Sequence, residues 1–273
     1  MSACGADPSS FEGPLPSLTA QFECLPKSTA MISAHRGTVH GSGYAENGLR
    51  GLQALIKRGY LMSEIDVARL KDGTYILFHD GVWEQDSTGR GAVAATTWEQ
   101  AEKYLLNDSQ GKLTSETPAK LGDYLSAARE KIYLEIDFKS SARYEDVINM
   151  IRAQGMAEHV ILIAYNAGQA RKLFSLAPEM WVSVSTQNAG DIRKFKNEKA
   201  AAWLGKSISN QRLIQDLENL STPILGSMGR EWSAQKSQNA DLLVTDYAFN
   251  HRPITGLTGK TKKDYEACLG RPR

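Results

Sequence analysis

Eight short apolar runs, most of them followed by a helical pattern, constrain the fold of this chain more than any other feature. Parallel strands must be joined by a crossover of about a dozen residues or more, usually a helix, so this alternation predicts a parallel sheet. Eight such units in a chain of 273 residues favour a closed TIM (β/α)8 barrel. An open doubly wound sheet is the alternative, but no glycine-rich phosphate-binding turn follows the first run at the expected spacing. The predicted strands begin at Met31, Leu61, Lys131, His159, Met180, Ala200, Pro223 and Asp241.

The helical patterns between these runs give the approximate positions of an outer layer. Asn47 is the expected N-cap of the first helix, since its side chain can accept a hydrogen bond from the first turn. The expected helices cover residues 47–59, 97–106, 121–130, 167–176, 189–196, 207–220 and 231–238.

A hairpin signal interrupts the alternation after the second strand. Asp72-Gly73 stands between two apolar-rich runs, and such a pair is favoured in a two-residue type I′ turn. The return run, residues 74–78, follows too closely for a parallel crossover. We therefore expect one extra antiparallel strand outside the parallel set.

The same hairpin predicts a cluster of ionisable side chains. With a two-residue loop, counting back along the ladder sets Asp66 directly opposite His79. Glu64 shares the face of Asp66 because side chains alternate along a strand. A buried face rarely holds three such groups unless they bind a metal or do chemistry.

Further polar side chains gather at the carboxyl ends of the predicted strands, where the active site of a TIM barrel lies. Carboxylates make an all-oxygen site that suits Mg²⁺ or Ca²⁺ better than zinc, because no cysteine cluster or paired-histidine spacing accompanies them. Arginine and lysine supply positive charge for a phosphate, and two histidines can act as general base and general acid. The set, which predicts phosphodiester cleavage, comprises His35, Arg36, Glu64, Asp66, His79, Asp137 and Lys139.

These residues stand in motifs that resemble the glycerophosphodiester phosphodiesterase family, and the resemblance covers roughly residues 31–250. The matching motifs are His35-Arg36-Gly37, Glu46-Asn47, Glu64-Ile65-Asp66, Lys71-Asp72-Gly73, His79-Asp80, the loop Ser87-Thr88-Gly89-Arg90-Gly91 and Thr245-Asp246. The resemblance implies a TIM-barrel hydrolase that uses a divalent metal to release glycerol phosphate and an alcohol from deacylated phospholipids. In the mechanism it implies, the glycerol 2-hydroxyl attacks phosphorus, one histidine takes its proton, and the other protonates the leaving alcohol.

The resemblance also implies roles for individual residues. It places metal ligands at Glu64 and Asp66 and the catalytic histidines at His35 and His79. The third ligand has two candidates on one strand face. The family shows an acidic residue two positions before a lysine, which favours Asp137 in Asp137-Phe138-Lys139, whereas an alternative alignment makes Glu135 the ligand. Further candidates to assist the site or to shape a pocket for the alcohol group are Glu46, Trp203, Tyr165 and Met228.

Three functions fit the motifs. The first is a metal-dependent phosphodiesterase that acts on small glycerophosphodiesters. The second is a lyase of the sphingomyelinase D type, which a lipid-docking apolar loop would favour, and the sequence shows no such loop. The third is a lipoprotein that binds a phosphate-bearing ligand without turnover, and the intact set of acids and histidines argues against it. The net charge of +1 gives no reason to expect a nucleic-acid partner.

The two ends of the chain carry signals of compartment. Residues 1–28 are expected to form a tether or an N-terminal extension and residues 29–273 the single barrel domain, because the segment up to about residue 27 is polar and lacks periodicity. Ser2-Ala3-Cys4 resembles the end of a bacterial lipoprotein signal, which predicts export and a membrane tether through Cys4. A disulfide between Cys24 and Cys268 would fit export, whereas two free thiols would fit a cytoplasmic protein.

Overall fold

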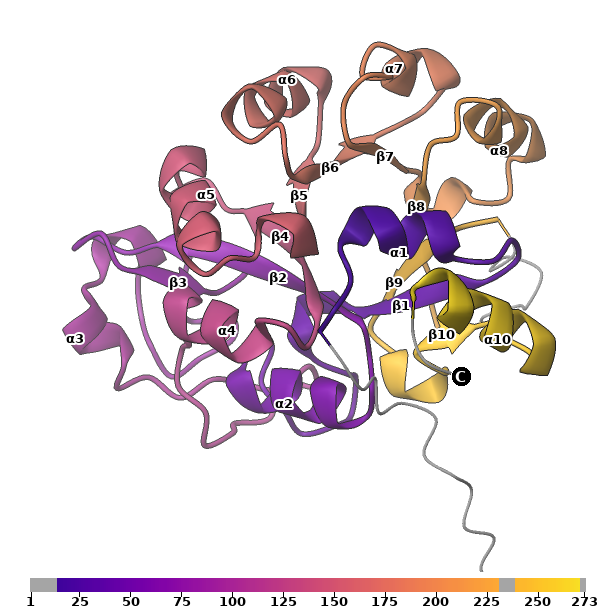
Figure 1. Ribbon diagram of the computed structural model, residues 1–273. Helices are drawn as coiled ribbons and strands as arrows, with labels where there is room; N and C mark the ends of the chain where they lie inside the picture. The colour runs from indigo at the N-terminus through magenta and orange to yellow at the C-terminus, as the bar shows by residue number, and fades with distance from the viewer. Residues whose placement is uncertain (1–13, 231–238, 271–273) are drawn as a thin grey trace, which may run out of the picture.

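Strand pairing closes on itself, as a barrel requires. In the computed structural model, which describes residues 14–230 and 239–270, β1 (Ala30–Ala34) pairs in parallel with both β2 (Met62–Arg69) and β9 (Leu242–Thr245). The remaining ring strands are β4 (Tyr133–Phe138), β5 (Val160–Ala164), β6 (Trp181–Ser185), β7 (Ala200–Trp203) and β8 (Ile224–Ser227). The predicted TIM barrel is confirmed, and each of the eight parallel strands lies close to its predicted start (Figure 1).

Helices surround this ring and bury an apolar face against it (Figure 1). Those near predicted positions are α2 (Leu49–Lys57), α3 (Trp98–Ala101), α4 (Leu121–Ala128), α6 (Ala167–Leu176), α7 (Ala189–Arg193) and α8 (Gln211–Glu218). Three others have no counterpart in the prediction: α1 (Leu18–Cys24), α5 (Tyr144–Ala153) and α10 (Gly259–Cys268). The helix predicted at residues 231–238 lies outside the described residues. In the described part of the chain, no helix combines the length and the apolar character needed to span a bilayer.

The extra strand β3 (Tyr75–Leu77) pairs antiparallel with β2 outside the ring, as predicted, but the predicted register is wrong by one residue. The hairpin loop has three residues, 71–73, instead of two. Gly73 adopts a φ of 92°, which fits the left-handed last position of a three-residue loop. Asp66 therefore lies opposite Phe78, whose N–H donates to the Asp66 carbonyl at 3.0 Å, and not opposite His79.

The segment before β1 closes the N-terminal end of the barrel. Leu18 of α1 is fully buried among the apolar side chains at that end of the strands. The hydroxyl of Tyr133 donates to the carbonyl of Pro16 at 2.8 Å. Cys24 at the end of α1 is bonded to Cys268 of α10, which decides between the disulfide and the two free thiols that the sequence left open. Residues 14–28 pack against the barrel as an extension rather than a tether, whereas residues 1–13 lie outside the described residues.

A second extra strand, β10 (Ile254–Thr255), pairs antiparallel with β1 and has no counterpart in the prediction. It lies outside the ring, so the closed barrel itself contains the eight parallel strands only.

The barrel interior changes from apolar to polar along its axis. At the N-terminal ends of the strands, residues such as Met31 and Tyr133 form an apolar layer. Two positions further along, the buried side chains include Glu135 and Ser183, and the next inward position on β4 is Asp137. The strands thus deliver ionisable groups to their carboxyl ends, where the ring opens to solvent.

Candidate active site

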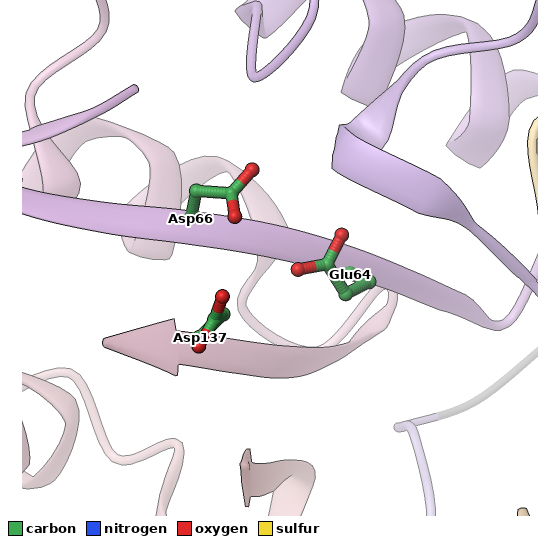
Figure 2. A group of neighbouring side chains, drawn as sticks. All are labelled: Glu64, Asp66 and Asp137. Carbon is green, nitrogen blue, oxygen red and sulfur yellow. The ribbon is translucent and has the colours of Figure 1, made fainter. Parts of the chain in front are cut away.

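Three carboxylates converge at the carboxyl ends of β2 and β4 (Figure 2). Glu64 and Asp66 lie two residues apart on β2, and the register pairs Asp66 with Asp137 of β4. One oxygen from each residue lies within 4.8 Å of the others, and all three residues are buried. Burial, reinforced by the charge of Asp66, raises the pKa of Glu64 well above its usual range. Such a cluster requires a cation or bound protons, because buried carboxylates repel one another.

The donor set fits a hard divalent cation. Carboxylate oxygens are the ligands that Mg²⁺ and Ca²⁺ prefer, and the group contains no cysteine or histidine. Oδ1 of Asp137 is buried and has no hydrogen-bond partner within the described residues, so it is available to a ligand. The preference for Asp137 over Glu135 agrees with this geometry, since Glu135 falls outside the group. The role of the three residues as ligands stays a prediction.

The sequence predicted that Asn47 is the N-cap of α2, and this prediction is wrong. Asn47 instead holds Asp66 in place. Its backbone adopts a φ of 58°, and Gly48 occupies the N-cap position. The side-chain amide of Asn47 donates to Oδ2 of Asp66 at 2.9 Å and accepts from the Asp66 N–H at 2.9 Å. Glu116, from a distant loop, accepts the N–H of Arg50 in the first turn of α2 instead. Asn47, from the Glu46-Asn47 motif, therefore acts on the acid cluster by fixing the position of Asp66.

Two cations lie beside the acid cluster. The ammonium of Lys139 contacts Oδ1 of Asp66 at 2.6 Å and Oδ2 of Asp137 at 2.7 Å. Burial opposes its charge, but the two carboxylates raise the pKa of Lys139 on balance. Arg36 donates to Oε2 of Glu46 at 2.7 Å, and its backbone N–H donates to Glu64 at 2.7 Å. The predicted residues Arg36, Glu46 and Lys139 thus belong to one network of charges with the carboxylates.

Both predicted catalytic histidines face the site, and each is held by an aspartate. Nδ1 of His35 lies 2.7 Å from Oδ1 of Asp246, and its Nε2 lies 4.0 Å from Oε2 of Glu64. Nδ1 of His79 lies 2.8 Å from Oδ1 of Asp80. An ionised carboxylate can only accept, so Nδ1 carries the proton in each ring and Nε2 is free to exchange protons in the cavity. The hydrogen bond to His35 lowers the pKa of Asp246, which keeps that carboxylate ionised.

A cavity of about 350 Å³ joins these groups to the far wall of the barrel. Its near wall contains His35, Glu64, Asp66, His79, Asp137 and Asp246. Its far wall contains Ser185, Trp203, Lys206 and Met228, whereas Tyr165 lies beside the carboxylates, since its hydroxyl donates to Oδ2 of Asp137 at 2.8 Å. The predicted pocket residues Trp203, Tyr165 and Met228 therefore line the same space as the carboxylates. Lys206, which no sequence motif indicates, adds a cation at the far wall.

The floor of the cavity is polar. Glu135 and Ser183 lie there, and both are buried. Burial raises the pKa of Glu135 to about 7, and its Oε2 has no hydrogen-bond partner within the described residues. This extra acid lies one layer below Asp137 on β4. It adds a group that can accept or donate a hydrogen bond deep in the cavity.

Two sequence comparisons find that the chain is similar to glycerophosphodiester phosphodiesterases. The family model "Glycerophosphoryl diester phosphodiesterase family" matches residues 35–219. Glycerophosphodiester phosphodiesterase 1 of Rattus norvegicus is 33% identical over 109 residues, which cover 40% of this chain and 32% of the relative. A glycerophosphodiester phosphodiesterase of Caldanaerobacter subterraneus is 25% identical over 164 residues, which cover 58% of this chain and 67% of the relative. The match thus spans about a third of the length of the mammalian relative.

Solved structures share the barrel. A glycerophosphoryl diester phosphodiesterase from Parabacteroides distasonis superimposes with a TM-score of 0.74 at 18% identity, covering 94% of this chain and 93% of that chain. A phosphodiesterase from Oleispira antarctica, solved in complex with the product sn-glycerol-3-phosphate, has a TM-score of 0.62 at 16% identity and covers 84% of this chain and 96% of that chain. At these identities the likeness establishes the fold.

Proposed function

Because the chain belongs to the glycerophosphoryl diester phosphodiesterase family, we propose that it hydrolyses glycerophosphodiesters to glycerol phosphate and an alcohol. One observation carries the proposal: two histidines, each held at Nδ1 by an aspartate, line the same cavity as the Glu64–Asp66–Asp137 cluster. A phosphodiesterase needs a proton acceptor, a proton donor and positive charge near the phosphate, and this cavity offers all three.

The carboxylates would hold Mg²⁺ or Ca²⁺, and a bound divalent cation offsets the charge that develops on phosphate oxygens and lowers the pKa of a coordinated hydroxyl. Asn47 fixes the orientation of Asp66, so one ligand is preset for that cation. Arg36 and Lys139 place positive charge beside the carboxylates. Their position supports the prediction that these two cations bind phosphate.

The two imidazoles divide the proton transfers. One Nε2 takes the proton of the attacking hydroxyl, which we propose is the glycerol 2-hydroxyl, and the other gives a proton to the oxygen of the leaving alcohol, which leaves a cyclic phosphate on the glycerol. A water molecule then opens this cyclic phosphate to glycerol phosphate, with its proton taken by the second imidazole and the released glycerol oxygen protonated by the first. The negative charges of Asp246 and Asp80 stabilise whichever imidazole is protonated, since each lies within 2.8 Å of an Nδ1. The far wall, with Trp203 and Met228, would receive the leaving alcohol.

A panel of glycerophosphodiesters, assayed for released glycerol phosphate with and without a chelator, tests this function. We expect turnover that the chelator abolishes and that added Mg²⁺ or Ca²⁺ restores. Replacing His35 or His79 with alanine should lower kcat by about 10²–10⁴-fold, because each removes one proton-transfer group. His159→Asn is the matched control, since this histidine contacts the carbonyl of Leu15 at the opposite end of the barrel.

Near-normal turnover by the His79→Ala variant would disprove the assignment of roles. Formation of a cyclic phosphate from sphingomyelin or lysophosphatidylcholine, without hydrolysis of the small diesters, would favour the lyase instead. Binding of the diesters without any release of glycerol phosphate would favour the non-catalytic lipoprotein.

We also propose that the protein works in an oxidising compartment. The disulfide between Cys24 and Cys268 supports this proposal, because such bonds persist in exported proteins and are rare in the cytoplasm. The membrane tether through Cys4 stays a prediction, since Cys4 lies outside the described residues. Metabolic labelling with a radioactive fatty acid, compared between the protein and its Cys4→Ser variant, tests the tether.

A further inference from the structure

The two carboxylate oxygens of Asp137 have different surroundings. Oδ2 accepts a hydrogen bond from the hydroxyl of Tyr165 at 2.8 Å, and it lies 2.7 Å from the ammonium of Lys139. Oδ1 is buried and has no hydrogen-bond partner within residues 14–230 and 239–270. One oxygen of Asp137 is therefore held by donors of the protein, and the other is left for a ligand in the cavity.

The backbone of Tyr165 is fixed on both sides. Tyr165 directly follows β5, which pairs with β4, the strand that carries Asp137. The N–H of Tyr165 donates to Oε1 of Gln169 at 2.7 Å. The next residue, Asn166, is the N-cap of α6, and its side chain accepts the N–H of Gln169. Only Tyr165 and Asn166 lie between β5 and α6, so the strand and the capped helix together set where the Tyr165 side chain begins.

The ring of Tyr165 contributes little to the core. Tyr165 is 60% exposed, although its hydroxyl bonds to a buried carboxylate. It lines the cavity beside that carboxylate. Burial of apolar surface is small for a side chain that lies mostly in solvent, so packing does not explain why a tyrosine stands here. The hydrogen bond to Asp137 does explain it, because it requires the hydroxyl.

The other two carboxylates of the cluster are held in the same way. Oε2 of Glu64 accepts the backbone N–H of Arg36 at 2.7 Å. Oδ2 of Asp66 accepts from the side-chain amide of Asn47 at 2.9 Å. Carboxylates that bind a metal are commonly oriented by hydrogen bonds of this kind. The Tyr165 hydroxyl is thus the counterpart, at Asp137, of the donors that hold the two acids of β2.

We propose that Tyr165 is a positioning residue for Asp137: its hydroxyl holds Oδ2 and thereby leaves Oδ1 to a divalent cation. This inference rests on the proposed function, because it takes Glu64, Asp66 and Asp137 as the metal ligands. Lys139 also contacts Oδ2 of Asp137, but it bridges to Oδ1 of Asp66 at 2.6 Å. The Tyr165 hydroxyl is therefore the donor that can be removed without changing a contact of Asp66.

Tyr165→Phe tests this role, since it removes the hydroxyl and keeps the ring. We would measure the dissociation constants of Mg²⁺ and Ca²⁺ by titration calorimetry on the whole protein. The affinity for Mg²⁺ should fall by about 10-fold, because losing a hydrogen-bond partner of a metal ligand costs about 10–100-fold. The affinity for Ca²⁺ should fall by only about 3-fold, because Ca²⁺ accepts a flexible geometry whereas Mg²⁺ demands a near-ideal octahedron.

Tyr75→Phe is the matched control. The hydroxyl of Tyr75 donates to Oδ2 of Asp146, also at 2.8 Å, and neither residue lines the cavity. This variant loses the same kind of hydrogen bond and should leave both metal affinities unchanged. Unchanged Mg²⁺ affinity in Tyr165→Phe, or an equal loss in Tyr75→Phe, would overturn the proposal. The same fold loss for Mg²⁺ and Ca²⁺ would also overturn it, because a general disturbance of the fold would not distinguish the two cations.

Turnover at high Mg²⁺ separates positioning from a direct part in the reaction. With Mg²⁺ raised to saturate Tyr165→Phe, kcat should return to within about 3-fold of the wild-type value, because the defect lies in binding the cation. A kcat that stays low at saturating Mg²⁺ would overturn the positioning role, since the hydroxyl would then act on the reaction itself.

The metal titration needs no turnover, so it also separates this inference from the proposed function. If no glycerophosphodiester is hydrolysed but Tyr165→Phe weakens Mg²⁺ binding as expected, the proposed function fails and the role of Tyr165 stands. If the diesters are hydrolysed and Tyr165→Phe binds Mg²⁺ as the wild type does, the inference fails by itself. A wild-type protein that binds neither cation would overturn both.

Discussion

The contact between α2 and the loop that carries His35 predicts that a single methyl group at Gly51 would disturb the site. A Cβ atom at Gly51 would lie closer to the carbonyl oxygen of Gly37 than carbon and oxygen approach in folded proteins, with the carbonyl carbon of Gly37 3.4 Å away. The neighbour is backbone, so no side chain can rotate aside. Either α2 or the His35–Gly37 turn must move by several tenths of an ångström.

The magnitude follows from two opposing effects of Gly51→Ala. Overpacking a rigid contact costs about 1–3 kcal/mol, and alanine gains up to about 1 kcal/mol over glycine in a helix interior. We expect a net loss of about 1–2 kcal/mol in the free energy of unfolding. Because the turn carries His35 and Arg36, a shift of this size should also lower kcat/KM by about 10–100-fold.

Gly122→Ala is the matched control for Gly51→Ala. Gly122 lies in the first turn of α4, and the nearest atom to its added Cβ is Cε of Met150 at 3.9 Å, an ordinary contact. This variant should gain about 0.4–1 kcal/mol and keep its kcat/KM. Both variants can be compared by denaturant unfolding and by the rate of glycerol phosphate release. A Gly51→Ala protein as stable and as active as Gly122→Ala would refute the claim that α2 fixes the His35 turn.

Two further predictions concern stability. Replacing both Cys24 and Cys268 with serine opens a covalent loop that spans 244 positions. We expect the free energy of unfolding, measured by chemical denaturation, to fall by about 2–5 kcal/mol. Turnover should be retained, because the bond lies at the opposite end of the barrel from the cavity. Burial raises the pKa of Glu135 to about 7 from its ordinary 4.5, so the folded state keeps a proton that the unfolded state has lost between these values. The free energy of unfolding should therefore fall by about 3 kcal/mol as the pH rises from 4.5 to 7. The Glu135→Gln side chain cannot ionise, so this variant should lose most of that fall when unfolding is measured at pH 5 and pH 8.

The elements that the sequence predicts well are those whose apolar pattern faces the common core. The eight parallel strands are buried on both sides and therefore appear as apolar-rich runs, which acids interrupt only in β2 and β4. By contrast, α10 buries only Tyr265, and α1 buries Leu18 and Gln21, so neither shows the apolar repeat of an amphipathic helix. For α5 the signal is present, since Val147, Ile148 and Ile151 form one buried stripe.

The residues of the candidate site also fall into two groups, those that the sequence could predict and those that it could not. Its carboxylates could be predicted because Glu64 and Asp66 have the period of a strand, which fixes their face without knowledge of any partner. The partners of those groups could not be derived from periodicity. Asn47 reaches Asp66 from a backbone with positive φ, and Glu116 reaches the start of α2 from a distant loop. Contacts of this kind depend on loop conformation, which local sequence specifies weakly.

His79 faces the cavity although the predicted hairpin register is wrong by one residue. In a regular ladder, a slip of one residue would turn His79 to the other face of the sheet. The last paired residue of β3 is Leu77, so His79 lies beyond the ladder and strand alternation no longer sets its direction. Its direction is set instead by the hydrogen bond from Nδ1 to Asp80. The position of this histidine therefore depends on a neighbouring carboxylate rather than on the strand before it.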